Sequence, residues 1–274
     1  MSLGISSYTY AWNIGIPGSP LPVQPMNALG LVQRAADLNV AVVQIADNLP
    51  LHRLDASQLD ALYTLADVNR TQIEVGTRGV DPDHLRRYLE IARQFASPIV
   101  RVVVDTADQH PTPTEVIGAL RVILPEFEKA GIILAIENHD RFKTHTLIDI
   151  LTQANSSHIG ICLDTVNSFG AGEGPEVVVA ALAPYVVNLH VKDFVIRRHP
   201  SMLGFEVQGT PAGDGMLDVP WLFQQIRRLN SYDFNAILEL WTPPEATIEE
   251  SIQKEDRWAT RSVQYLKTLI ADLS

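Results

Sequence analysis

The sequence predicts an α/β protein, a single-domain (β/α)8 TIM barrel that occupies residues 1–274. Short apolar runs bounded by turn signals alternate with amphipathic segments along the whole chain, as expected for parallel strands covered by helices. The length of 274 residues and the 46% of hydrophobic residues suffice for one barrel of common size. A doubly wound open sheet is the alternative, but no G-x-G-x-x-G motif follows the first apolar run.

Eight apolar runs are predicted to be buried parallel strands, because such strands are covered on both faces. They cover residues 3–10, 41–46, 72–77, 99–104, 132–137, 158–164, 185–191 and 236–240. We expect the first barrel strand near residues 3–9 and the eighth near 235–240. The predicted helices cover residues 26–38, 59–68, 82–95, 113–130, 144–154, 175–183, 219–230 and 248–270. Eight strand–helix units without a linker of distinct composition favour the closed barrel.

Two helices carry clear start signals. Asp81 and Thr112 are predicted N-caps, and Pro82 and Pro113 follow them in the first turn, where proline is well tolerated. Gly131 is expected to end the second of these helices, because glycine readily adopts the left-handed backbone conformation that closes helices. The signals therefore set the bounds of two of the helices that cover the barrel.

The composition excludes several partners and locations. The net charge of −11 and the pI near 5.1 argue against nucleic acid, which binds basic surfaces. No apolar stretch is long enough to span a membrane, and the N-terminal segment lacks the basic and hydrophobic regions of a signal peptide. The one cysteine, Cys162, lies in the apolar run IGICL and is predicted to be a buried, unreactive thiol. We therefore expect a cytoplasmic protein without intrachain disulfides.

Four ionisable residues lie at the ends of successive predicted strands. Glu137, Asp164, His190 and Glu239 belong to the runs IILAIE, IGICLD, VVNLH and NAILEL. A carboxylate or imidazole at the last buried position of a strand is costly to leave unpaired. A single such residue is often a helix cap or a core histidine. Because the carboxyl ends of barrel strands meet at one face, four in succession predict a shared divalent metal ion.

The ligand types indicate which metal the site would take. Three carboxylates and one imidazole without a thiolate favour Mn²⁺ or Mg²⁺, with Co²⁺ and Zn²⁺ as alternatives. The three carboxylates and a divalent ion leave about one net negative charge. Open coordination positions would let a substrate chelate through two oxygens. Glu137 and Glu239, on the fifth and eighth strands, are then candidates for moving a proton on that substrate.

The motifs AIENHD, GICLDTVNSFG, NLHVKDF and AILELW resemble those of the sugar isomerase/epimerase superfamily with a xylose-isomerase-like barrel. The similarity covers about the last two-thirds of the chain. It implies Glu137, Asp164, His190 and Glu239 as metal ligands, and the two glutamates as the acid/base pair of ketose 3-epimerases. At Asn167 the chain departs from that subgroup, which resembles D-x-x-H where this sequence reads D-T-V-N.

The departure at Asn167 leaves other branches of the superfamily open. The stretch H-V-K-D is more similar to the dehydratase and endonuclease-like branches, but the acidic charge argues against DNA. The longest segment predicted to be irregular, residues 194–215, begins with Arg197, Arg198 and His199. These cations are either a solvated turn or a clamp for a carboxylate or phosphate. The segment also resembles a decarboxylase-type branch acting on branched 3-oxo sugar acids.

Further substrate contacts are predicted around the strand ends. His139 follows Glu137 by two residues, and Lys192 is expected to point to the same side as His190. Trp12 could form an apolar wall for a sugar ring. We expect Arg101 and Glu74 near strand ends as well, and a salt bridge in the barrel mouth is the alternative role of Glu74. The residues expected around the substrate are Trp12, Glu74, Arg101, His139, Asn167, Lys192 and Arg197.

The leading functional prediction is a metal-dependent isomerase or epimerase that acts on a small polyhydroxy keto substrate through an enediolate. The substrate is either neutral or anionic. A metal-dependent lyase, either a decarboxylase of a 3-oxo sugar acid or a dehydratase, is the first alternative. A non-catalytic sugar-binding barrel is the second. A homo-oligomer is compatible with the sequence, which does not determine the oligomeric state.

Overall fold

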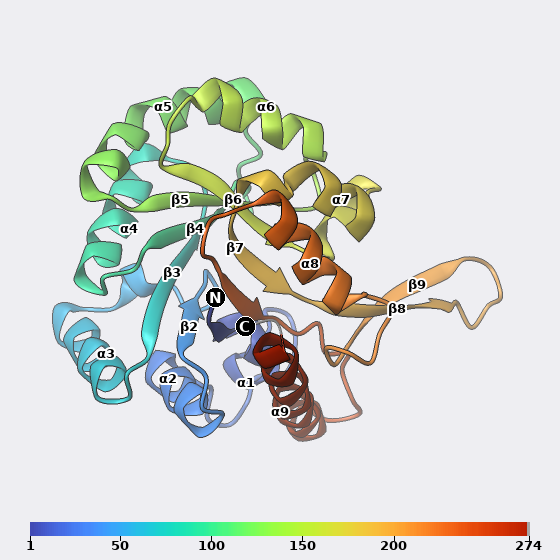
Figure 1. Ribbon diagram of the computed structural model, residues 1–274. Coiled ribbons are helices and arrows are strands. Elements are labelled where there is room, and N and C mark those ends of the chain that lie inside the picture. Colours follow the sequence, from blue (N-terminus) through green and yellow to red (C-terminus); the bar gives the residue numbers. More distant parts are fainter. Residues whose placement is uncertain (273–274) are drawn as a thin grey trace.

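The computed structural model describes residues 1–272 and forms a closed barrel of parallel strands inside a ring of helices (Figure 1). The strands are β1 (Leu3–Ser6), β2 (Val42–Ile45), β3 (Gln72–Arg78), β4 (Ile99–Val103), β5 (Ile133–Glu137), β6 (Ile159–Asp164), β7 (Val186–Val191) and β10 (Asn235–Leu238). Neighbours in the chain are neighbours in the sheet, and β1 pairs with both β2 and β10 to close it. The predicted fold class is therefore confirmed.

The helices follow the strands as predicted. They are α1 (Ala11–Ile14), α2 (Ala28–Asp37), α3 (Ala56–Val68), α4 (Pro82–Gln94), α5 (Pro113–Ala130), α6 (Thr144–Ala154), α7 (Pro175–Leu182), α8 (Val219–Leu229) and α9 (Ile248–Asp272), with 3-10 turns η1 (Ser7–Tyr10), η2 (Leu51–Arg53), η3 (Asn167–Ala171) and η4 (Ala183–Tyr185). Asp81 and Thr112 cap α4 and α5 through their side chains. Gly131 ends α5 in the left-handed conformation, with φ of 67°.

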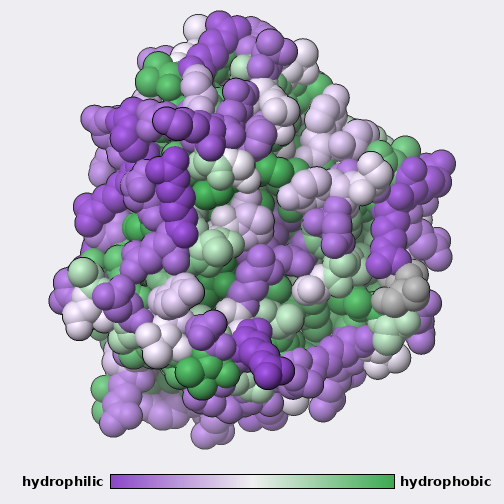
Figure 2. Space-filling view, turned by 60° about the vertical axis from the view of Figure 1, so that its left-hand side comes forward, coloured by the Kyte–Doolittle hydropathy of each residue, from purple (hydrophilic) through white to green (hydrophobic). Residues whose placement is uncertain are grey.

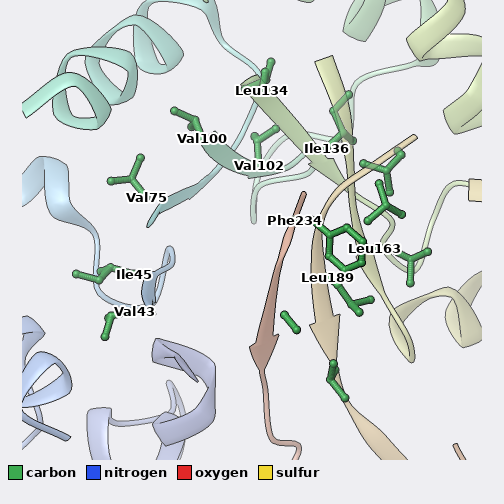
Figure 3. Packing of buried hydrophobic residues seen from close by; sticks show 14 of the residues in the cluster. Val43, Ile45, Val75, Val100, Val102, Leu134, Ile136, Leu163, Leu189 and Phe234 are labelled. Atoms are coloured by element: carbon green, nitrogen blue, oxygen red, sulfur yellow. The ribbon is translucent and has the colours of Figure 1, made fainter. Parts of the chain in front are cut away.

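Alternate residues of each strand build the core between sheet and helices. Val43, Val75, Val102 and Leu134 are fully or almost fully buried and point outward from the barrel (Figure 3). Full burial of such a side chain contributes about 1.5–3 kcal/mol. Since side chains alternate along a strand, the residues between them face the barrel interior. This alternation directs the ionisable strand-end residues inward.

The first predicted strand is too long by four residues. β1 ends at Ser6, whose side chain accepts a hydrogen bond from Tyr8 N at 3.0 Å, while Thr9 Oγ1 accepts one from Ser6 N at 2.9 Å. This reciprocal capping starts η1 where the apolar run continues in the sequence. Local capping therefore overrides the strand propensity of the last residues.

The segment predicted to be irregular contains an antiparallel hairpin. β8 (Asp193–Arg198) pairs with β9 (Phe205–Thr210), and the hairpin projects from the barrel beside α8 (Figure 1). The two strands make their main contacts with each other, outside the barrel sheet. Phe194 at the base of β8 packs into the core, but neither strand joins the barrel sheet, so the continuous apolar pattern that reveals barrel strands does not mark them.

The outer surface of the helices is mostly hydrophilic, with small apolar patches between the charged side chains (Figure 2). No helix in the described part of the chain combines the length and the apolar character needed to cross a membrane.

Candidate metal centre and active-site cavity

The structure brings the four predicted metal ligands together at the carboxyl ends of β5, β6, β7 and β10. His190 Nδ1 lies 3.4 Å from Glu137 Oε2 and 3.4 Å from Glu239 Oε1. The same nitrogen lies 3.7 Å from Asp164 Oδ2. All four side chains are at most 2% exposed. One imidazole nitrogen thus faces one oxygen from each of three carboxylates.

Orphaned atoms at this point fit a divalent cation. Within residues 1–272, His190 Nδ1 and Glu239 Oε1 are buried without a hydrogen-bond partner, and the buried Asp164 Oδ2 has only the Lys192 ammonium beside it. Bonds of about 2.0–2.2 Å to one central ion would separate such donors by about 3–3.5 Å, close to the distances observed. Cys162 Sγ also lies near Glu137 and His190. Burial raises the pKa of that thiol to about 11.

Two buried cations complete the cluster. Lys192 Nζ lies 2.8 Å from Asp164 Oδ2 and 2.8 Å from Glu239 Oε2, within ion-pair distance. Arg101 Nε donates to Glu137 Oε2 at 2.5 Å. Burial alone would raise the pKa values of Asp164 and Glu239, but the nearby positive charges, Lys192 and His190 foremost, lower both. Both carboxyls are therefore ionised and available to a metal.

Asn167 occupies a position beside Glu137. Its Nδ2 donates to Glu137 Oε1 at 2.7 Å, and its Oδ1 lies 3.5 Å from Lys192 Nζ. Since Arg101 already binds the other oxygen, both oxygens of Glu137 accept hydrogen bonds from side chains. The residue that differs from the epimerase pattern thus restrains one of the two glutamates expected to move protons.

A cavity of about 500 Å³ opens above the cluster. Four of the residues expected to contact substrate line it: Trp12, His139, Asn167 and Lys192. Trp12 is held in place because its Nε1 donates to Thr242 O at 2.8 Å. One wall is therefore apolar and aromatic and the floor is charged, an arrangement suited to a small polyhydroxy compound.

The structure does not bring Arg197 to this cavity. Its side chain is exposed on β8, in the hairpin that projects from the barrel, and it is absent from the residues that line the cavity. Glu74 is also placed differently from the prediction. It is buried within the barrel, away from any salt bridge in the described residues, and its carboxylate accepts from amides of Gln44, Asn188 and Asn235.

This buried amide network reaches the candidate metal ligand. His190 Nε2 lies 2.7 Å from Gln44 Oε1, while Gln44 Nε2 donates to Glu74 Oε2 at 3.1 Å and to Asn188 Oδ1 at 2.9 Å. Because the amide nitrogen of Gln44 faces the carboxylate, its oxygen must face His190. With a divalent ion bound, the imidazole would therefore keep its proton on Nε2 and present Nδ1 to the ion.

Sequence reasoning missed Gln44 and Asn188. The available signal was a polar residue at an inward position of an otherwise apolar run, in AVVQIA and in VVNLH. Such a residue is costly to bury without partners, so it indicates a polar network inside the barrel.

Comparisons with known proteins agree with this architecture. The profile of the xylose isomerase-like TIM barrel family matches residues 32–267. The chain is 36% identical over 268 residues to the 3-oxo-isoapionate decarboxylase of Pectobacterium atrosepticum, covering 98% of this chain and 96% of that protein.

Two solved structures share the fold at low sequence identity. A xylose isomerase-like TIM barrel protein from Mycobacterium smegmatis, in complex with magnesium, superposes with a TM-score of 0.71 at 12% identity and covers 96% of this chain and 97% of its own. D-psicose 3-epimerase from Clostridium cellulolyticum H10, with D-tagatose, has a TM-score of 0.73 at 13% identity and covers 98% and 99%.

Proposed function

The chain belongs to the xylose isomerase-like TIM barrel family, and from this premise we propose that it is a metal-dependent decarboxylase of a branched 3-oxo sugar acid. The near full-length similarity to a 3-oxo-isoapionate decarboxylase supports this substrate class. The sequence alone favours isomerisation and keeps the lyase as the first alternative. The charges inside the cavity, considered with that relative, reverse the order.

The balance of charge around the ligands carries the proposal. Three carboxylates and a divalent ion alone would leave one net negative charge. Arg101 and Lys192 reach into the cluster, so the loaded site would instead carry about one net positive charge. At the rim, the charges of Arg78 and Asp47 cancel, and Asp47 also pairs with Arg101. Glu255 lines the cavity too, and because burial raises its pKa to about 7, its carboxyl is neutral below that pH. A site of this sign attracts an anionic substrate such as a sugar acid.

The chemistry of a 3-oxo acid matches this site. The bond between the carboxylate carbon and C2 breaks, CO₂ leaves, and the electron pair enters the enolate of the neighbouring ketone. A divalent ion held by Glu137, Asp164, His190 and Glu239 would supply Lewis-acid stabilisation of that oxyanion. The Lys192 ammonium adds a fixed positive charge on the cavity floor, and Trp12 walls the cavity. A proton then replaces CO₂ at C2.

The constraint on Glu137 favours the lyase over an epimerase. Epimerisation needs a free base that removes a proton from carbon. Both oxygens of Glu137 are already hydrogen-bonded, to Arg101 and to Asn167. Decarboxylation requires no such abstraction, because loss of CO₂ itself generates the enolate. Glu239 Oε1 lacks a hydrogen-bond partner, but it faces the metal position beside His190 Nδ1, and Oε2 lies 2.8 Å from Lys192 Nζ. A one-base isomerisation, the second candidate, would need Glu239 to release one of these two oxygens.

Product analysis of the Mn²⁺- and Mg²⁺-loaded enzyme tests the proposal. We expect release of CO₂ from 3-oxo-isoapionate or a close 3-oxo sugar acid, and no conversion of neutral ketoses of similar size. Glu239→Gln should weaken metal binding and lower turnover by about 10²-fold or more. Mass-neutral conversion of ketoses, with no CO₂ from any 3-oxo acid, would replace the lyase by the isomerase. Failure to bind any divalent ion would refute both.

A further inference from the structure

We propose that the β8–β9 hairpin, residues 193–210 and here named the arm, joins two copies of this chain into a dimer by mutual exchange of arms. Each arm would place its apolar tip in a groove at the base of the other copy's arm. The inference concerns assembly and does not depend on the reaction.

The arm is built like an element that needs a partner. A two-stranded hairpin is at best marginally stable alone in water. This one projects from the barrel (Figure 1), yet exposes large apolar side chains near its turn. Leu203 is 83% exposed, and Met202 and Phe205 are each 66% exposed. Contiguous apolar side chains on an exposed projection mark an interaction site.

The two faces of the arm differ. Ile196 pairs with Val207, and Arg198 pairs with Phe205. Because side chains alternate along strands, these four residues share one face. The Arg198 guanidinium carbon lies 4.8 Å from the centre of the Phe205 ring, in agreement with that arrangement. Arg197 belongs to the opposite face. The apolar face is therefore continuous from the tip to the base of the arm.

A groove of about 430 Å³ lies at the base of the same face. Its apolar lining includes Phe194 and Ile196 from the arm, Met216 from the segment that leads into α8, and Trp221 from the first turn of α8. Met216 is 60% exposed, so the groove is open to a partner. The groove reaches along β8 to Ile196, whereas the apolar tip begins beyond Arg198, where β8 ends, so the tip points away from its own groove.

This placement of tip and groove on one surface selects a second copy as the occupant. A two-fold interface is made of the same patch on both subunits, and it must complement itself. Two antiparallel arms satisfy this condition, since each tip would reach the other's groove. A different partner protein would need to match only the tip or only the groove.

Charge supports the same pairing. Glu176 and Asp218 line the groove, and neither carboxylate has a cationic partner among residues 1–272. Arg198 is the positively charged residue on the apolar face of the arm, and no carboxylate in the described part of the chain pairs with it. Opposite charges that lack partners within one copy would meet across the interface, which fixes the orientation of the two arms.

Sedimentation of the full chain at about 1–100 μM is the first test. We expect a dimer for the wild type, and a rise in dissociation constant of about 100-fold or more for the double variant Leu203→Glu, Phe205→Glu. Val23→Glu is the matched control, because Val23 is 90% exposed on another loop. A monomeric wild type over the whole range, or an unchanged double variant, would overturn the proposal.

A charge exchange tests the orientation without relying on apolar residues. Arg198→Glu and Glu176→Arg should each weaken self-association, because each homodimer holds two like-charge contacts. An equal mixture of these two variants should form the heterodimer, in which both contacts are again opposite in sign. Arg197→Glu, on the other face of the arm, should leave association unchanged. Absence of heterodimer in the mixture contradicts arm exchange.

Disulfide trapping locates the contact directly. The native Cys162 is buried, so an added surface cysteine is a clean probe. A mixture of Leu203→Cys and Met216→Cys proteins should give a mixed disulfide under mild oxidation. A bond between two Leu203→Cys copies alone would indicate tip-to-tip contact and overturn the proposed arrangement.

Discussion

Replacement of Gln44 by methionine tests the inferred orientation of His190. Methionine keeps the length of the side chain but removes the acceptor for His190 Nε2 and the donor to Glu74 and Asn188. Glu74 keeps its bonds from Asn188 and Asn235, whereas His190 Nε2 has no second partner in the described structure. Leaving the buried His190 Nε2 without a partner lowers the free energy of unfolding by about 1–3 kcal/mol, and the loss of each bond from Gln44 to Glu74 and Asn188 lowers it by about 1 kcal/mol.

We therefore expect Gln44→Met to lower the free energy of unfolding by about 3–5 kcal/mol, the sum of the lost partner of His190 and the lost bonds to Glu74 and Asn188. Metal affinity should fall by about 10–100-fold, because the imidazole loses the partner that holds its orientation and tautomer. Calorimetric titration with Mn²⁺ and unfolding in guanidinium measure the two effects. Nitrogen-15 NMR of the Mg²⁺ form reports directly which nitrogen of His190 carries the proton.

The matched control is Gln33→Met, since Gln33 is an exposed glutamine on α2 that bonds Asp37. It should change neither quantity. If Gln44→Met binds Mn²⁺ within about threefold of the wild type, the amide does not orient His190. A loss of stability with unchanged metal affinity would leave Gln44 a purely structural role.

Three further predictions concern single side chains. Lys192→Met should lower turnover by about 10²–10³-fold with metal binding retained, because it removes a fixed charge from the cavity floor; steady-state kinetics and calorimetry separate the two. Arg197→Ala should keep kcat/KM within about threefold of the wild type. A loss above tenfold would support the sequence-based prediction that Arg197 binds the substrate anion. Burial raises the pKa of Glu255 to about 7 from 4.5. As the pH rises from 4.5 to about 7, Glu255 loses its proton in the unfolded chain but keeps it in the folded protein, which favours unfolding. Over this range the free energy of unfolding of the wild type should fall by about 3 kcal/mol relative to that of Glu255→Gln, as measured by urea unfolding.

Much of the fold follows from local signals in the sequence. Apolar runs that must be buried on both faces reveal the barrel strands, and cap–proline pairs such as Thr112 and Pro113 set helix starts to the residue. The strand-end positions of Asp164 and His190 place their side chains at one face because parallel strands end together. Their convergence is therefore a consequence of strand order and alternation, both readable in the chain.

The remaining features depend on contacts that sequence pattern does not encode. β8 and β9 lie outside the barrel sheet, so no continuous burial pattern marks them. Arg197 lies on this hairpin and is exposed, and for that reason it does not reach the cavity. Arg101 lies at an inward position in the run IVRVV, but its approach to Glu137 depends on register between β4 and β5. The sign of the charge in the cavity, on which the proposed decarboxylation is argued, is therefore visible only in three dimensions.

The interior of the barrel argues for a catalytic role over a non-catalytic sugar-binding one. TIM barrels ordinarily fill this space with bulky branched residues. Here the separate apolar cluster in the interior consists of Ile99, Ala135 and Cys162, with charged and amide side chains above and around it. Burial of an ion costs several kcal/mol unless partners compensate it. Neutral sugars are bound well by hydrogen bonds from uncharged groups, which do not carry that cost. The unpartnered nitrogen of His190 and the unpartnered oxygen of Glu239, which face each other, therefore indicate a site built to hold a cation.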